Sequence, residues 1–145
     1  MTTESANDSR RQSTILVVED NPGVRDIAVE MLKLSGYQVI EAEDAKSGLA
    51  EFMAHPEIDL VFTDVIMPGG ISGIEMAKDI LSERPHALIL LATGYQEKGN
   101  ALKAHAAKSE NVAAVSKPYD VNEIPKLIES MLARAASEPK ANLNA

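Results

Sequence analysis

Carboxylate, hydroxyl and amino side chains stand at the ends of four short apolar runs in this 145-residue sequence. Glu19 and Asp20 end the first of these runs, and Asp64, Thr93 and Lys117 end the three others. Carboxylate oxygens are ligands for hard cations such as Mg²⁺, and an ammonium group can pair with a carboxylate or a phosphoryl group. These residue types therefore suit metal-assisted chemistry on phosphate, provided that the fold brings them together.

The apolar runs that precede these side chains have the length and composition of buried strands. Each consists mainly of aliphatic residues and is bounded by polar, Gly or Pro residues. A further run from Tyr37 has strand character but ends in no comparable polar group. We expect five strands, at residues 14–18, 37–42, 59–63, 87–92 and 112–115.

Apolar side chains at helical spacing predict a helix after each strand. Asn21, Asp44 and Ser72 are suited to cap the first three helices at their N-termini. Pro125 must lie in the first turn of the last helix, which favours a start near Asn122 over an earlier one.

The fourth helix, expected over 96–108, has a weak apolar face made mostly of alanines. Gly99 costs it about 1 kcal/mol relative to Ala, so we expect it to dock loosely.

Five strand–helix units in succession predict an α/β fold with a doubly wound parallel sheet of five strands and five helices. The C-terminal ends of parallel strands lie at one edge of the sheet, where ligands bind in such folds. Asp64 by itself could merely begin a turn. Together with Glu19, Asp20, Thr93 and Lys117 at the same edge, it indicates a functional site.

Three clustered carboxylates repel one another unless a cation is present, and repulsion would raise some of their pKa values. Oxygen ligands of this kind suit Mg²⁺, which keeps several waters and completes its shell with a phosphate. We therefore expect a magnesium site.

Length and composition indicate a single domain and exclude several classes of protein. The chain has 45% hydrophobic residues, no cysteine and a net charge of -8. The charges of its two ends balance, so the acidity belongs to the folded part and disfavours direct nucleic acid binding. No stretch approaches the roughly 18 apolar residues of a membrane span. We expect a cytoplasmic protein with disordered tails at 1–12 and 135–145 and one domain at 13–134.

Several motifs occur in a fixed order along the chain: Glu19-Asp20, Asp64 within Thr-Asp-Val-Ile-Met-Pro-Gly-Gly, Thr93 within Ala-Thr-Gly-Tyr, and Lys117-Pro118. Over residues 13–134 this pattern resembles the receiver domain of bacterial two-component response regulators. The resemblance implies a flavodoxin-like fold with strand order 2-1-3-4-5. The Ala-Thr-Gly-Tyr motif is similar to that of one receiver subgroup.

The resemblance implies that Asp64 accepts a phosphoryl group from a histidine kinase or a phosphotransfer protein. Thr93 and Lys117 would contact that group, and the peptide bond between Lys117 and Pro118 would be cis.

It also implies a ligand set for Mg²⁺. Asp20, Asp64 and the backbone carbonyl of Ile66 would bind the metal directly, and Glu19 would act through water.

One feature departs from the family. The aromatic residue three positions before the lysine, which changes rotamer on activation in most receivers, is replaced by Ala114. Thr93 and the nearby Tyr95 are therefore the candidate switch residues.

These features favour a signalling receiver without its own output domain, a monomer or weak dimer that regulates or relays to a protein partner. Such a protein is no enzyme beyond its own phosphorylation and dephosphorylation. The alternative is a Mg²⁺-dependent phosphatase with an aspartyl-phosphate intermediate. These enzymes share an acidic residue two positions after the nucleophile, and this chain has Ile66 at that position. A third possibility is a binding module that is never phosphorylated. The complete set of site residues argues against this possibility.

Overall fold

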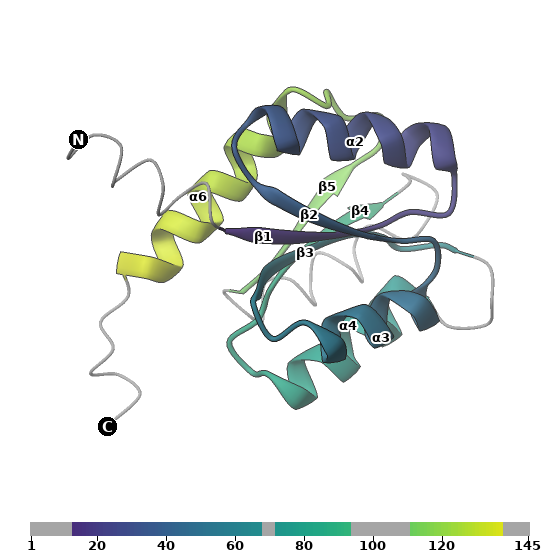
Figure 1. The fold of residues 1–145 in the computed structure, drawn as a ribbon, viewed down its shortest axis with the longest axis vertical. Helices are drawn as coiled ribbons and strands as arrows, with labels where there is room; N and C mark the ends of the chain where they lie inside the picture. Colours follow the sequence, from purple (N-terminus) through teal and green to yellow (C-terminus); the bar gives the residue numbers. More distant parts are fainter. Residues whose placement is uncertain (1–12, 68–71, 94–110, 138–145) are drawn as a thin grey trace.

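A five-stranded parallel sheet with strand order β2-β1-β3-β4-β5 forms the centre of the computed structural model, which describes residues 13–67, 72–93 and 111–137 (Figure 1). This order and the parallel direction confirm the predicted fold. The strands are β1 (Thr14–Val18), β2 (Gln38–Ala42), β3 (Ile58–Asp64), β4 (Leu88–Thr93) and β5 (Val112–Ser116).

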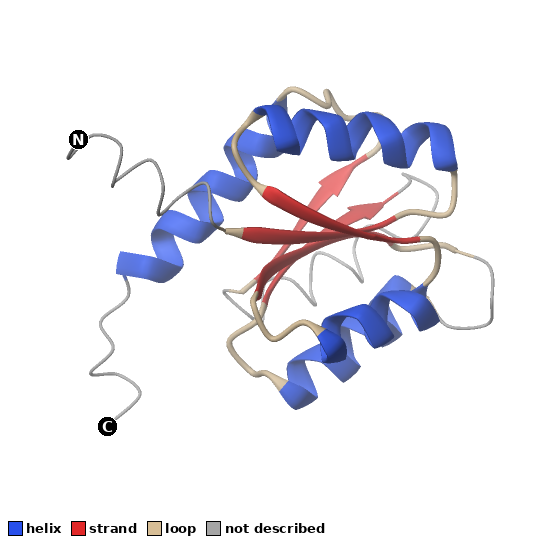
Figure 2. Cartoon of the chain, in the orientation of Figure 1, coloured by secondary structure: helices blue, strands red, loops and turns tan. Residues whose placement is uncertain are grey.

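Helices cover both faces of the sheet, as Figure 2 shows. Within the described residues they are α2 (Pro22–Leu34), α3 (Ala45–Ala54), α4 (Gly73–Glu83) and α6 (Glu123–Ser137). Helices α2 and α6 lie on one face, and α3 and α4 lie on the other. The expected helix 96–108 lies outside the described residues. None of the described helices is long and apolar enough to cross a membrane.

The predicted helix starts are confirmed. Asn21 caps α2, since its Oδ1 accepts a 3.0 Å hydrogen bond from the Val24 N–H. Asp44 and Ser72 each form a capping box with the residue three positions on. The Ser47 N–H and hydroxyl donate to the Asp44 carboxylate, and these bonds lower its pKa. The last helix begins at Glu123, one residue after the predicted start near Asn122.

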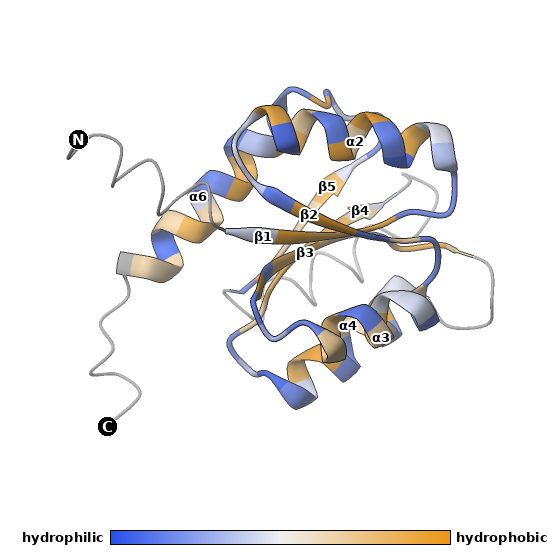
Figure 3. Cartoon of the chain, in the orientation of Figure 1, coloured by the Kyte–Doolittle hydropathy of each residue, from blue (hydrophilic) through white to orange (hydrophobic). Residues whose placement is uncertain are grey.

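The core consists of two layers of side chains, one on each face of the sheet. Figure 3 shows mostly hydrophobic strands between helices that carry both hydrophobic and hydrophilic residues. Phe52, Met76 and Ile80 pack on the face that α3 and α4 cover. Leu32 and Ile128 pack on the opposite face. Because β1, β3 and β4 are buried on both faces, the ends of these strands are held rigidly.

The C-terminal boundary of the folded part differs from the prediction. Helix α6 continues to Ser137 and passes the predicted end of the domain at 134. The reason is packing, because Leu132 and Ala135 lie against the core on the α2 side. The expected tail at 1–12 lies outside the described residues, as does the part of the expected tail at 135–145 that follows Ser137.

Gly48 of α3 offers a test of this packing. A Cβ at Gly48 would lie 2.9 Å from both Val18 Cγ2 and Met76 Sδ. Alanine has the higher helix propensity, but the buried, β-branched Val18 cannot move away easily. We expect Gly48→Ala to lower the free energy of unfolding by about 1–2 kcal/mol, measured by urea denaturation.

Gly23→Ala is the matched control for that substitution. A Cβ there would meet only Asn21 Oδ1, at 3.3 Å, in an exposed position of α2. We expect a stability within about 0.5 kcal/mol of the wild type. If both variants were equally stable, the close packing of α3 on β1 would be contradicted.

Candidate functional site

Three carboxylates meet at the C-terminal edge of the sheet. Glu19 and Asp20 follow β1, and Asp64 is the last residue of β3. Strands β1 and β3 are direct neighbours, so their ends lie side by side. One carboxylate oxygen from each of the three residues lies within 4.8 Å of the others.

Asp64 is buried, with 7% of its surface exposed, and both of its carboxylate oxygens have partners. The backbone N–H of Val65 donates to Oδ1 at 2.9 Å. Nζ of Lys117 forms an ion pair with Oδ2 at 3.0 Å. Because each carboxylate oxygen has its own partner, these two contacts fix the orientation of the carboxylate.

Lys117 reaches Asp64 because the end of β5 is tied to β4. Its backbone N–H donates a 2.6 Å hydrogen bond to the carbonyl oxygen of Thr93. The peptide bond from Lys117 to Pro118 is cis, as the resemblance implies. Burial alone would lower the pKa of Lys117, but the hydrogen bond and the charge of Asp64 outweigh it and raise that pKa. The side chain is therefore a cation at neutral pH.

Thr93 is the last residue of β4 and is buried. In the sheet register it lies one residue beyond Ala92, which is opposite Asp64. The structure thus places this hydroxyl-bearing residue at the same edge, between the strands that carry Asp64 and Lys117. Tyr95 lies outside the described residues, as do Gly69 and Gly70.

Glu19 is buried although it carries a carboxylate, with 8% of its surface exposed. Burial raises its pKa, a hydrogen bond from the Asn21 N–H lowers it, and the charge of Asp64 raises it again, so the net change is upward. The cluster thus contains a carboxylate whose charged form is disfavoured. Its oxygen-only donor set fits a hard cation such as Mg²⁺, which would relieve this cost.

Helix α4 begins directly against the backbone of Asp64. The Gly73 N–H donates a 2.8 Å hydrogen bond to the carbonyl oxygen of Val65. A side chain at Gly73 would collide with the backbone carbonyl of Asp64. Glycine is therefore needed at this position so that α4 can approach the end of β3 closely. Ile66, which is 59% exposed, lies in the connection between β3 and α4.

Sequence reasoning missed two residues near the site. The ring of Tyr119 packs edge-on against Phe62, with centroids 6.0 Å apart, and burial raises the pKa of its phenol. Arg25 binds the backbone of Glu19. Both residues left a signal in the sequence. Tyr119 is an aromatic residue directly after Pro118, and Glu41 in the second strand carries the charge opposite to that of Arg25.

Comparisons with known proteins agree with this geometry. The sequence profile of the response regulator receiver domain matches residues 15–129. A cyclic di-GMP phosphodiesterase of Thermotoga maritima is 34% identical over 84 residues, which are 58% of this chain and 22% of that protein. The transcriptional regulatory protein ResD of Bacillus subtilis is 27% identical over 137 residues, which are 94% of this chain and 55% of that protein.

A crystal structure is also similar along most of the chain. The CheY-like receiver domain protein from Methanospirillum hungatei JF-1 superposes with a TM-score of 0.77 at 25% identity, covering 88% of this chain and 99% of the other. The two curated relatives are longer, and this chain spans about half of their length or less.

The raised pKa of Glu19 predicts a pH-dependent stability. Below the ordinary value of 4.5, Glu19 is protonated in the folded and unfolded states alike. As pH rises, the unfolded chain releases this proton first, so the free energy of unfolding falls until the folded carboxyl has also ionised. We expect metal-free Glu19→Gln, uncharged throughout, to be more stable than the wild type at pH 7.

The measurement is urea denaturation of both proteins in chelator between pH 3 and 8. The advantage of Glu19→Gln should shrink as pH falls from the raised pKa of the folded carboxyl towards the ordinary value of 4.5, and should no longer change below that value. A constant difference across this range would show that the charge of Glu19 is not the cause.

Proposed function

Because the chain belongs to the family of response regulator receiver domains, we propose that Asp64 accepts a phosphoryl group from a histidine kinase or a phosphotransfer protein. The observation that carries this proposal is the Asp64 carboxylate, oriented by the Val65 N–H and by Lys117 and flanked by two further acids. An oriented carboxylate beside a cation is suited to attack phosphorus.

In the transfer, one carboxylate oxygen of Asp64 forms a bond to phosphorus while the bond from phosphorus to the donor breaks. The donor leaves with the electron pair of that bond. Lys117, already 3.0 Å from Asp64, then pairs with a phosphoryl oxygen, and the Thr93 hydroxyl donates to another. These contacts hold the transferred group at the edge of the sheet.

Mg²⁺ is the proposed cofactor, and when bound it offsets negative charge on the transferring group. Asp20, Asp64 and the backbone carbonyl of Ile66 would hold it, with Glu19 acting through water. The cluster of three carboxylates within 4.8 Å supports this set.

The phosphorylated chain would regulate a protein partner or pass the phosphoryl group to one. The relatives include a phosphodiesterase and a transcriptional regulator, so the same kind of domain occurs in proteins of different activity. The absence of an output domain, the monomeric or weakly dimeric state and the cytoplasmic location stay predictions. The role of Tyr95 as a switch, in place of the aromatic residue that most receivers have at the position of Ala114, is also still a prediction.

A phosphatase with an aspartyl-phosphate intermediate is the competing function. It would need an acid two residues after the nucleophile, where this chain has Ile66. Among the residues that the structure describes, the acids gathered at the site are Glu19, Asp20 and Asp64, all before or at the nucleophile. Turnover of phosphate esters would favour the phosphatase, whereas phosphorylation without such turnover favours the receiver.

Asp64→Asn tests the phosphorylation site. We expect the wild type to gain one phosphoryl group from a small phosphodonor in the presence of Mg²⁺, and the variant to gain none, because an amide is a poor nucleophile. Mass spectrometry of the intact protein measures the gain. Asp79→Asn, on an exposed position of α4, is the control and should be phosphorylated normally. Undiminished phosphate on Asp64→Asn would contradict the assignment.

Substitutions of the two neighbouring acids test the metal site. Loss of a residue that acts through water typically costs about 10–100-fold in metal affinity, and loss of a direct ligand should cost more. We therefore expect Asp20→Ala to weaken Mg²⁺ binding more than Glu19→Ala, as measured by calorimetric titration.

Thermal unfolding provides a second readout of the same prediction. At a Mg²⁺ concentration about 100 times the Kd, the wild type should gain about 2.7 kcal/mol. The gain should be smaller for Glu19→Ala and smallest for Asp20→Ala. The reverse ranking of the two variants would reject the assigned roles.

A further inference from the structure

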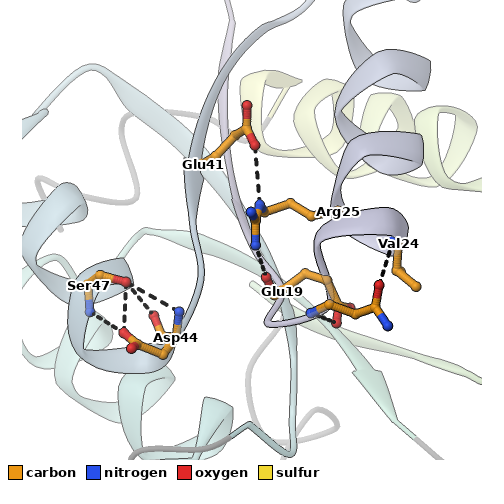
Figure 4. Close-up of polar contacts among 7 residues, drawn as sticks. Glu19, Val24, Arg25, Glu41, Asp44 and Ser47 are labelled. Atoms are coloured by element: carbon orange, nitrogen blue, oxygen red, sulfur yellow. Dashed lines mark hydrogen bonds and ion pairs between the residues drawn. The ribbon is translucent and has the colours of Figure 1, made fainter.

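Arg25 of α2 connects the backbone of the acidic site to strand β2, as Figure 4 shows. Its Nη1 donates a 2.7 Å hydrogen bond to the carbonyl oxygen of Glu19. Its Nε donates to Oε1 of Glu41 at 3.2 Å. The side chain of Arg25 is only 18% exposed, so it is packed in place rather than solvated.

These contacts hold Glu19 from several directions. Its backbone N–H donates to the carbonyl oxygen of Ala42 at 3.1 Å. Its own carbonyl accepts from Arg25, which Glu41 holds in turn. The Asn21 N–H donates to its side chain at 3.1 Å. Strand β2, which ends in no reactive group, therefore contributes to the site by fixing the residue that precedes Asp20.

We propose that Arg25 is a positioning residue that sets the affinity of the acidic site for Mg²⁺ by holding the peptide between Glu19 and Asp20. This inference rests on the metal site of the proposed function. Asp20 follows the held carbonyl directly, so its carboxylate projects from a fixed backbone. Without Arg25, the chain beyond β1 gains freedom that metal binding must remove, and binding weakens.

The positive charge of Arg25 acts in the opposite direction, because a nearby cation disfavours a second one. Glu41 offsets this charge, and the guanidinium contacts the carbonyl oxygen of Glu19. We therefore expect the positional effect to exceed the electrostatic one. The two effects change the Kd for Mg²⁺ in opposite directions, so the sign of the change is decisive.

The test is calorimetric titration of the full chain with Mg²⁺, together with thermal unfolding in chelator. Arg25→Met keeps the aliphatic stem and a good helix former. Its Kd for Mg²⁺ should rise about tenfold or more. Arg25→Lys keeps the charge but loses the guanidinium group that reaches both the Glu19 carbonyl oxygen and Oε1 of Glu41. We therefore expect a smaller rise in Kd than for Arg25→Met.

Arg84→Met is the matched control. Nη1 of Arg84 donates a 2.8 Å hydrogen bond to the carbonyl oxygen of Ile58, at the start of β3 and therefore at the opposite edge of the sheet. Its guanidinium also lies 4.1 Å from the centroid of the Phe52 ring. We expect a lower thermal midpoint in chelator with the wild-type Kd for Mg²⁺.

An unchanged or lower Kd in folded Arg25→Met would overturn the inference and leave the proposed function intact. Equal weakening in Arg84→Met would also overturn it, because general loss of stability would then explain the effect. If Arg25→Met does not fold, Arg25→Lys takes its place, and a wild-type Kd in that variant is the overturning result. A wild type that binds no Mg²⁺ would refute the proposed metal site itself.

Discussion

Mutual repulsion among Glu19, Asp20 and Asp64 is the constraint that the surrounding structure has to meet. Three carboxylates with oxygens within 4.8 Å of one another would separate unless the backbone held them. Two of them are also largely buried, which removes the water that would screen their charges. The ion pair between Lys117 and Asp64 offsets part of the repulsion, and a bound cation would offset more.

Backbone contacts do most of the positioning. The Val65 N–H orients Asp64, the Thr93 carbonyl holds the Lys117 N–H, and the Ala42 carbonyl holds the Glu19 N–H. Each contact lies at a strand end, where hydrogen bonds between neighbouring strands hold the backbone group in a fixed direction. The sheet register thus determines the geometry of the site, and this explains why buried strands with little polar content can support a charged site.

Much of the fold could be predicted from local patterns. The strands were recognisable as short apolar runs, and Asn21, Asp44 and Ser72 as helix caps, because capping depends on neighbours within three residues. The end of α6 could not be predicted in the same way. Its last turn is retained because Ala135 packs on the core, and no local signal reports that contact.

The sequence by itself determined which groups could do chemistry here, since acids, a threonine and a lysine at the ends of parallel strands must share one edge. Only the tertiary structure decided how those groups are held. The contacts of Arg25 with Glu19 and Glu41, and the close approach of Gly73 to Asp64, join segments that are separate in sequence. Distances of this kind depend on register and packing, which no single stretch of the chain encodes.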